Sequence, residues 1–265
     1  MKIIERIEDF ENPDPAKPVV LTIGNFDGVH RGHQVILRRL NDKTKKVDGH
    51  QLLITFSNHP SEILNPNHPI PLLCTLEHKL KLIESSGVDT LLLLPFTRSL
   101  ANHSAADFIK KIRRLIPFEY LLLGYDATFG KDRQGKPQVI QGLASDWGFE
   151  VEYLEEYRYE GKPVSSSRIR DLLQAGDLEQ VEELLGRPYS IYLKAPVIDQ
   201  IQSLQFVVKG LCMPPSGVYP ITVKTDKTLI SGTAYLNTDT SILKVNLDEP
   251  LNCLKDLFVE IVFRS

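Results

Sequence analysis

The sequence predicts an α/β protein, in which a parallel sheet is followed by a small antiparallel β domain. Up to about residue 187, short apolar runs alternate with segments of helical period. This alternation is typical of βαβ units. Beyond it, short strand-like runs are separated by turn residues, and no strong helix follows. That pattern indicates a small barrel or sandwich. We therefore expect two domains, 1–187 and 188–265.

Hydrophobic period places the elements of the first domain. Residues 1–18 form a lead-in that is rich in turn residues. Short apolar runs, which suit strands buried on both faces, occur at 19–23, 51–56, 89–94, 120–123 and 150–154. Helical spacing is found over 33–46, 75–86, 104–115, a segment ending near 147, and 177–185. Thr75 and Ser104 are expected N-caps.

The second domain is expected to contain six strands. They are predicted at 191–198, 204–208, 218–223, 229–236, 242–245 and 258–263. Turn residues such as those at 214–217 and 237–239 separate them.

Composition limits the classes of protein that need to be considered. A formal charge of −3 argues against a general nucleic-acid-binding surface. No apolar run approaches the roughly 20 residues needed to span a bilayer, and the first residues have no signal-peptide core. Three scattered cysteines fit a reducing compartment better than a disulfide framework. We expect a cytoplasmic protein without membrane or nucleic-acid partners; its oligomeric state is not indicated.

The segment after the first predicted strand has the features of an anion site. Gly24 and Gly28 allow backbone conformations that a Cβ would block, and a helix begins near His33. Free N–H groups and the dipole at a helix N-terminus attract anions. His30 and His33, three residues apart, can add donors aimed at a phosphate. A zinc site is the alternative, but further ligands at metal spacing are not evident.

A second polar motif, Val164-Ser-Ser-Ser-Arg-Ile-Arg170, precedes a helical run. A serine N-cap explains one hydroxyl, and a merely capped helix with surface arginines remains an alternative. Three hydroxyls, exposed N–H groups and guanidinium groups at one helix start are also the parts of an anion cradle. The glycine-rich basic loop 124–136 follows another predicted strand and is a solvated loop or part of a ligand site.

The two motifs together indicate phosphate chemistry on an α/β sheet. In nucleotidyl transfer the protein need not supply a nucleophile, because a phosphate of the second substrate can attack the α-phosphate of a nucleotide. There is no Gly-x-x-x-x-Gly-Lys-[Ser/Thr] loop, which disfavours a P-loop kinase. There is no Gly-x-Gly-x-x-Gly after the first strand, which disfavours a dinucleotide dehydrogenase.

Residues 19–190 closely resemble the adenylyltransferase module of prokaryotic bifunctional riboflavin kinase/FAD synthetases, within the HxGH nucleotidyltransferase superfamily. The resemblance implies a Rossmann-like parallel-sheet nucleotidyltransferase domain that transfers AMP from ATP to FMN, with Mg²⁺, giving FAD and pyrophosphate. Four blocks carry it: Thr22 to His33; Thr55-Phe56 with His59-Pro60; Gly124 to Gly135; and Val164 to Arg170 followed by Leu184 to Tyr189.

The resemblance also implies roles for individual residues. The expected catalytic residues are His30, His33 and Arg170. The expected ATP-binding residues are Gly24, Phe26, Asp27, Gly28, Asp126, Ser165, Ser166 and Ser167. The expected flavin-binding residues are Phe56, Asn58, His59 and Pro60. No metal ligands are assigned. The chain departs from the family pattern at Ser167, usually threonine, at Ala127, usually aromatic, and at Ser57-Asn58, usually an acidic residue and proline.

The second domain matches the family less well. The family has a six-stranded riboflavin kinase barrel followed by a helix, and Gly217-Val218-Tyr219 matches one of its strands. The glycine-rich segment with Pro-Thr-Ala-Asn that would hold the kinase phosphates and Mg²⁺ is absent, and the acidic base is not evident. We therefore expect a degenerate, shortened kinase-like barrel and a monofunctional FAD synthetase. A bifunctional riboflavin kinase/FMN adenylyltransferase and a non-catalytic flavin-binding regulatory protein are the alternatives.

Overall fold

The computed structural model describes residues 1–125, 127, 130, 135–195, 201–251 and 258–264. By their internal contacts they form two compact units. Unit 1 comprises Met1–Ile70 and Leu80–Pro163, and unit 2 comprises Pro71–Lys79 and Val164–Ser265. The contact-based division falls at Pro163–Val164, and the expected boundary at residue 187 stays a prediction.

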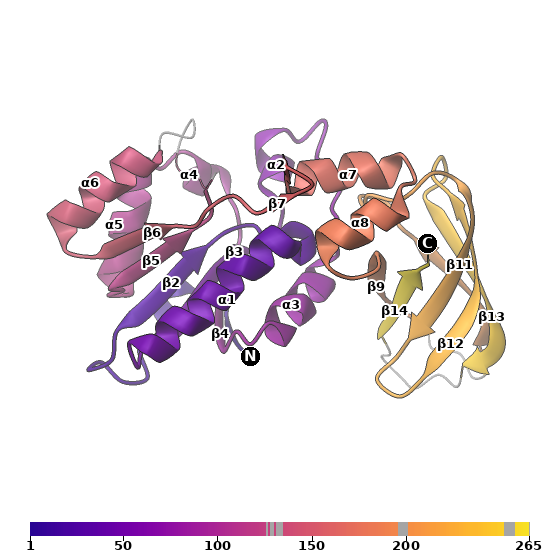
Figure 1. Ribbon diagram of the computed structural model, residues 1–265, viewed down its shortest axis with the longest axis horizontal. Helices are drawn as coiled ribbons and strands as arrows, with labels where there is room; N and C mark the ends of the chain where they lie inside the picture. Colours follow the sequence, from indigo (N-terminus) through magenta and orange to yellow (C-terminus); the bar gives the residue numbers. More distant parts are fainter. Residues whose placement is uncertain (126, 128–129, 131–134, 196–200, 252–257, 265) are drawn as a thin grey trace. The chain divides into compact units, whose positions relative to one another are not determined.

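Unit 1 is built on a six-stranded sheet in which every pairing is parallel (Figure 1). The spatial order is β1-β4-β3-β2-β5-β6. The bounds are β1 Lys2–Ile4, β2 Val19–Ile23, β3 His50–Phe56, β4 Thr90–Leu94, β5 Tyr120–Leu123 and β6 Glu150–Tyr153. The predicted α/β class is confirmed. β1 was not predicted, because its three residues are too few to show a period.

The strand order reverses beside β2. From β2 the chain passes outward through β3 and β4 on one side, and later through β5 and β6 on the other. In open α/β sheets, ligands bind outside the carboxyl ends of the strands at this switch point. A ligand-binding site is therefore expected at the segments that follow β2 and β5.

Helices cover both faces of this sheet (Figure 1). Helix α1 (Arg31–Lys46) packs on β2, β3 and β5 and buries Leu37 and Leu40. On the other face, α5 (Ala105–Leu115) and α6 (Pro137–Trp147) pack on the alternate residues Val19, Leu21 and Ile23 of β2. Because successive strand residues point to opposite faces, the continuous apolar run of β2 fills both layers.

Several short elements of unit 1 were not predicted. They are η1 (Ile7–Asp9), η2 (Asp27–Val29), α2 (Pro60–Leu64), α4 (Arg98–Ala101) and the hairpin of β7 (Arg158–Tyr159) and β8 (Lys162–Pro163). Helix α2 begins at Pro60, because proline is well suited to the first position of a helix. Helix α3 (Leu76–Ser85) runs across the division between the units, and the predicted N-cap at Thr75 is confirmed by the His78 N–H bond to Thr75 Oγ1, 3.2 Å.

Unit 2 contains two helices, α7 (Ser166–Gln174) and α8 (Leu178–Leu185), and a six-stranded antiparallel sheet curled into a half-barrel. Its order is β10-β13-β12-β11-β14-β9. The bounds are β9 Ser190–Lys194, β10 Ile201–Val207, β11 Gly217–Lys224, β12 Leu229–Asn237, β13 Ile242–Leu251 and β14 Phe258–Phe263.

Two strand ends of unit 2 differ most from the prediction. β9 ends at Lys194 rather than at residue 198, and residues 196–200 lie outside the described residues. β13 extends to Leu251 rather than ending at 245, since the charged pair Asp248-Glu249 interrupts the apolar pattern but not the strand.

Residues 71–79, which we call the strap, belong to unit 2 although unit 1 continues after them. Leu72 forms a parallel bridge with Leu211. Its N–H donates to the carbonyl of Gly210 at 2.8 Å, and its carbonyl accepts from the Cys212 N–H at 2.7 Å. The strap is thus attached to unit 2 by backbone hydrogen bonds.

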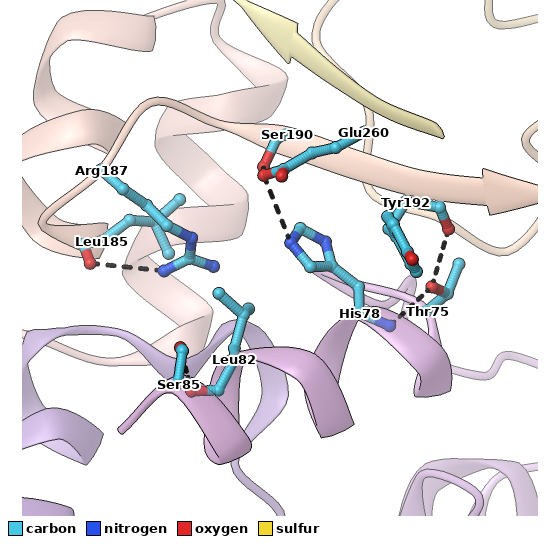
Figure 2. A network of polar contacts seen from close by, with 9 residues as sticks. All are labelled: Thr75, His78, Leu82, Ser85, Leu185, Arg187, Ser190, Tyr192 and Glu260. Atoms are coloured by element: carbon cyan, nitrogen blue, oxygen red, sulfur yellow. Dashed lines mark hydrogen bonds and ion pairs between the residues drawn. The ribbon is translucent and has the colours of Figure 1, made fainter. Parts of the chain in front are cut away.

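A polar network fixes the end of the strap against β9 and β14 (Figure 2). Thr75 Oγ1 donates to the carbonyl of Tyr192 at 3.0 Å. The His78 ring is buried, and its Nε2 lies 3.8 Å from Glu260 Oε1. Ser190 Oγ donates to the same carboxylate oxygen at 2.8 Å. Glu260 therefore joins the strap to both strands.

None of the helices in the described part of the chain combines the length and apolar character needed to cross a bilayer.

Candidate active site

The loop between β2 and α1 has an unusual backbone. Phe26 (φ 52°, ψ 32°) and Val29 (φ 40°) are left-handed although neither is glycine, and Gly28 has φ 75°. A Cβ on Gly24 would lie 3.0 Å from a ring carbon of Phe26, whose side chain is 1% exposed. Left-handed bulky residues cost free energy and cluster at functional sites. The predicted roles of Gly24 and Gly28 in shaping this loop therefore have a geometric basis.

Two side chains hold carbonyl groups of this loop. Thr55, at the carboxyl end of β3, donates from Oγ1 to the carbonyl of Asn25 at 3.2 Å. Gln34, in the first turn of α1, donates from Nε2 to the carbonyl of Val29 at 3.0 Å. Each bond fixes a peptide beside a left-handed residue.

His30 and His33 form a stacked pair at the start of α1. Their ring centroids are 3.7 Å apart and their planes differ by 16°. His30 is the N-cap, and its Nδ1 accepts a hydrogen bond from the His33 N–H at 3.3 Å. Because that nitrogen accepts, a neutral His30 ring carries its proton on Nε2, where it can donate. The Phe26 ring lies 5.1 Å from that of His33.

Asp27 is the buried acidic residue of the same loop, with 5% exposure. It lies in η2, directly before Gly28. Within the described ranges, no three His, Cys, Asp or Glu side chains gather closely enough to hold a metal ion.

The loop after β5 is described only in part. The predicted nucleotide contact Asp126 lies outside the described residues. Ala127, where the family usually has an aromatic residue, packs against the core, and its N–H donates to the carbonyl of Gly124 at 3.0 Å. At the carboxyl end of the neighbouring β6, burial raises the pKa of Tyr153 to about 12.

Phe56 ends β3 and meets an aromatic residue that sequence reasoning missed. The Phe96 ring lies edge-on to it, with centroids 5.3 Å apart. The Asn58 amide holds the backbone of Phe96 through two bonds: Nδ2 donates to its carbonyl at 3.1 Å, and Oδ1 accepts from its N–H at 2.8 Å. Asn58, predicted to bind flavin, thus positions Phe96. The position of Phe96 just beyond the strand at 90–94 was the signal available in the sequence.

His59 and Pro60 begin helix α2. His59 Nδ1 accepts from the Ser61 N–H at 3.1 Å, while the His59 N–H donates to Glu62 Oε1 at 2.8 Å, which completes a capping box. The imidazole predicted to face the flavin therefore serves as a helix cap.

The predicted serine cluster lies at the N-terminus of α7 in unit 2. Ser165 is the N-cap, and its Oγ accepts from the Arg168 N–H at 3.2 Å. Ser166 is the first helical residue, and Ser167 is exposed. The predicted helix start is confirmed, and it presents hydroxyls together with first-turn N–H groups.

Arg170 is buried in unit 2, with 9% exposure. Its Nε donates to the carbonyl of Pro71, the first residue of the strap, at 2.7 Å. The Cys212 thiol lies 3.8 Å from the carbonyl of Arg170. Arg170 thus has a structural task beside the catalytic role expected from sequence.

The structure brings the predicted residues together in two sets. Unit 1 gathers one set at the carboxyl edge of its sheet: Gly24, Phe26, Asp27, Gly28, His30, His33, Phe56, Asn58, His59 and Pro60. Unit 2 holds the other: Ser165, Ser166, Ser167 and Arg170. That both sets bind one ligand stays a prediction.

A parallel sheet with a histidine-capped helix at its switch point defines this chain as a Rossmann-like α/β protein. The comparison with known sequences is more specific. Residues 12–168 match the FAD synthetase family, and the chain belongs to that family.

Similar sequences include bifunctional riboflavin kinase/FMN adenylyltransferases of several bacteria. That of Pseudomonas fluorescens is 37% identical over 173 residues, which are 65% of this chain and 55% of the relative. That of Escherichia coli K12 is 30% identical over 230 residues, 84% of this chain and 73% of the relative. The chain spans 55%, 61% and 56% of the relatives from Pseudomonas fluorescens, Buchnera aphidicola and Haemophilus influenzae.

Among solved structures, the fold is similar to that of a macrolide-efflux protein from Streptococcus pneumoniae. The TM-score is 0.80 at 23% identity, over 98% of this chain and 88% of the other. This likeness concerns the fold alone.

Proposed function

We propose that the protein transfers AMP from ATP to FMN, giving FAD and pyrophosphate. One observation carries the proposal: the stacked pair of His30 and His33 at the N-terminus of α1, at the switch point of the sheet and inside the segment that matches the FAD synthetase family. The helix N-terminus and the two imidazoles make this position suited to a phosphate chain.

The proposed reaction is an in-line displacement at phosphorus. A phosphate oxygen of FMN attacks the α-phosphorus of ATP, the bond from that phosphorus to the oxygen bridging the β-phosphate breaks, and pyrophosphate leaves. No bond to the protein forms. The His30 Nε2–H, His33 and the first N–H groups of α1 would stabilise charge on the α-phosphoryl oxygens and the leaving pyrophosphate.

Mg²⁺ fits this proposal as an ion bound with ATP. In phosphate-transferring sites Mg²⁺ usually keeps several waters and binds through one or two carboxylates plus the substrate phosphates. We propose Asp27, a buried carboxylate in the β2–α1 loop, as the protein ligand of such an ion. The described residues contain no group of three His, Cys, Asp or Glu side chains that could hold a metal by itself. When bound, the ion would neutralise charge on the phosphates.

For FMN we propose the carboxyl edge of β3 and β4. Phe56 and Phe96 supply aromatic surface there, and Asn58 holds Phe96 in place. Aromatic side chains favour stacked or edge-on contact with a planar ring. We propose that His59 and Pro60 act by forming the start of α2 beside this surface rather than through the imidazole nitrogen used in capping.

The residues of unit 2 enter the proposal through the family resemblance. Ser165, Ser166 and Ser167 offer hydroxyls, and α7 offers first-turn N–H groups. We propose that they contact the ATP phosphates and that Arg170 supports this segment while contributing positive charge.

We further propose that the half-barrel of unit 2 lacks riboflavin kinase activity, since the chain lacks the glycine-rich Pro-Thr-Ala-Asn segment. The test is to incubate the protein with Mg-ATP and either riboflavin or FMN, and then to separate the flavins. FAD from FMN, with no FMN from riboflavin, supports the proposal. FMN formed from riboflavin would show a bifunctional enzyme, and flavin binding without any product would show a regulatory protein.

A further inference from the structure

The carbonyl groups on both sides of His30 are bound by a single residue. The Gln34 side chain donates from Nε2 to the carbonyl of Val29 at 3.0 Å. The Gln34 backbone N–H donates to the carbonyl of His30 itself at 2.9 Å. The two peptide planes that flank the His30 Cα are therefore both fixed from the first turn of α1, and with them the direction in which the His30 ring leaves the backbone.

The first of these bonds is needed because Val29 is an unfavourable residue at its position. A β-branched side chain at φ 40° is a steric outlier. Helix formation by itself satisfies the carbonyl of His30 but not the orientation of the preceding peptide. Without a donor on the carbonyl of Val29, that peptide can relax toward an extended conformation, and the His30 ring would turn away from His33.

We infer that Gln34 is a positioning residue for His30 in the proposed nucleotidyl transfer. Its amide is bonded to the protein, so it acts through the backbone rather than on the phosphates. The inference deepens the proposed function and rests on it for its kinetic test. It predicts a defect in the orientation of His30, whereas a merely structural glutamine would affect stability alone.

The chain offers a matched control in Gln51. This residue lies at the amino end of β3, away from the β2–α1 loop, and its Nε2 donates to the carbonyl of Gly87 and to Asp89 Oδ2, both at 2.9 Å. Gln51→Leu thus removes an amide that is bonded to backbone in the same unit, without touching the histidine pair.

The kinetic test compares Gln34→Leu, Gln34→Lys and Gln51→Leu. We expect Gln34→Leu to lower kcat for FAD formation at least about tenfold, with KM for FMN within about twofold, since small misplacements of a catalytic group are costly to rate. Gln34→Lys keeps an N–H donor and should recover part of kcat. Gln51→Leu should keep the wild-type kcat. A wild-type kcat in Gln34→Leu, or an equal loss of kcat in Gln51→Leu, would overturn the inference.

A second measurement does not depend on turnover. Long-range ¹H–¹⁵N NMR of the histidine rings should show His30 of the wild type as the Nε2–H tautomer, and Gln34→Leu should shift or mix the tautomers of His30 while Gln51→Leu leaves them unchanged. Unchanged His30 signals in Gln34→Leu would refute the inference. If the wild type made no FAD but this shift occurred, the proposed function would fail and the positioning of His30 by Gln34 would stand.

Discussion

The imidazole rings of His30 and His33 are stacked 3.7 Å apart, and the backbone amide of His33 donates to Nδ1 of His30. One ring thus caps α1 through Nδ1 and retains Nε2 as a donor. Substitution can therefore separate capping from catalysis. Capping needs only a side-chain acceptor near the backbone, whereas the proposed catalysis needs the Nε2–H donor of the imidazole.

We expect His30→Asn to retain the helix and lose the reaction. Asparagine is a favoured N-cap, so the free energy of unfolding should stay near that of the wild type, whereas His30→Ala should lower it by about 0.5–2 kcal/mol. Both variants lack the imidazole donor, and their rates of FAD formation should fall by about 10²–10³. Pyrophosphate release and chemical denaturation measure the two effects. Near-normal turnover by His30→Asn would contradict the role assigned to the ring.

Gly24→Ala should disturb the Phe26 ring. The new methyl group would lie 3.0 Å from one ring carbon and 3.2 Å from the next, and that ring lies against His33. Overpacking of this kind usually costs about 1–3 kcal/mol. The matched control is Gly142→Ala in α6, where an added Cβ would meet no neighbouring atom within 4 Å. This substitution should stabilise the protein by roughly 0.5–1 kcal/mol. Thermal unfolding distinguishes the two variants. Equal stabilisation by both would show that the Gly24 position accommodates a methyl group without overpacking.

Arg170→Ala should lower stability as well as activity. It removes the 2.7 Å hydrogen bond that the charged guanidinium donates to the half-buried carbonyl of Pro71, which should cost about 1.5–3 kcal/mol. We also expect a higher KM for ATP. Lys209→Ala, which removes an exposed charge of unit 2, is the control for the loss of a positive residue. Denaturation curves that coincide for Arg170→Ala and the wild type would argue against an anchoring role for this arginine.

Stability should decline at alkaline pH through Tyr153. Its pKa is raised by burial from the usual 10.0 to about 12, so the folded chain keeps the phenolic proton more tightly than the unfolded chain. The resulting stabilisation is complete below pH 10 and is lost as the pH rises toward 12. Burial also raises the pKa of Tyr192 and Tyr219, so these residues add to the decrease of stability with rising pH.

Tyr153→Phe isolates that contribution. Its hydroxyl is buried and has no hydrogen-bond partner within the described part of the chain, so at pH 7 the variant should be as stable as the wild type or slightly more stable. Between pH 8 and pH 11, the free energy of unfolding measured by chemical denaturation should decrease less for the variant than for the wild type. An identical decrease in both proteins would assign the alkaline slope to other groups.

The sequence predicted the central strands because strands buried on both faces are continuous apolar runs. β2 and β5 have this property. β1 and α4 escaped prediction because three or four residues show no period. β13 was predicted too short, since three consecutive exposed residues, 248–250, break the alternation between the buried Leu247 and the buried Leu251.

The parts of the candidate site that belong to a recognisable sequence motif could be predicted. His30 and His33 are recognisable from the strand, glycine turn and helix that surround them. The partners of Gln34, Thr55 and Asn58 are backbone groups of Val29, Asn25 and Phe96. Such bonds depend on the path of a loop and leave no residue pattern, which is why these supporting roles were not predicted from the sequence.

The strap has a consequence for the order in which this protein can acquire its structure. Residues 71–79 leave the ribosome before the whole of Leu80–Pro163, yet their bonding partners, such as Leu211, Tyr192 and Glu260, are synthesised later. During synthesis the strap therefore lacks these partners while residues on either side of it complete the parallel sheet. For the same reason, a gene cut at codon 163 or 187 would not yield two self-sufficient halves.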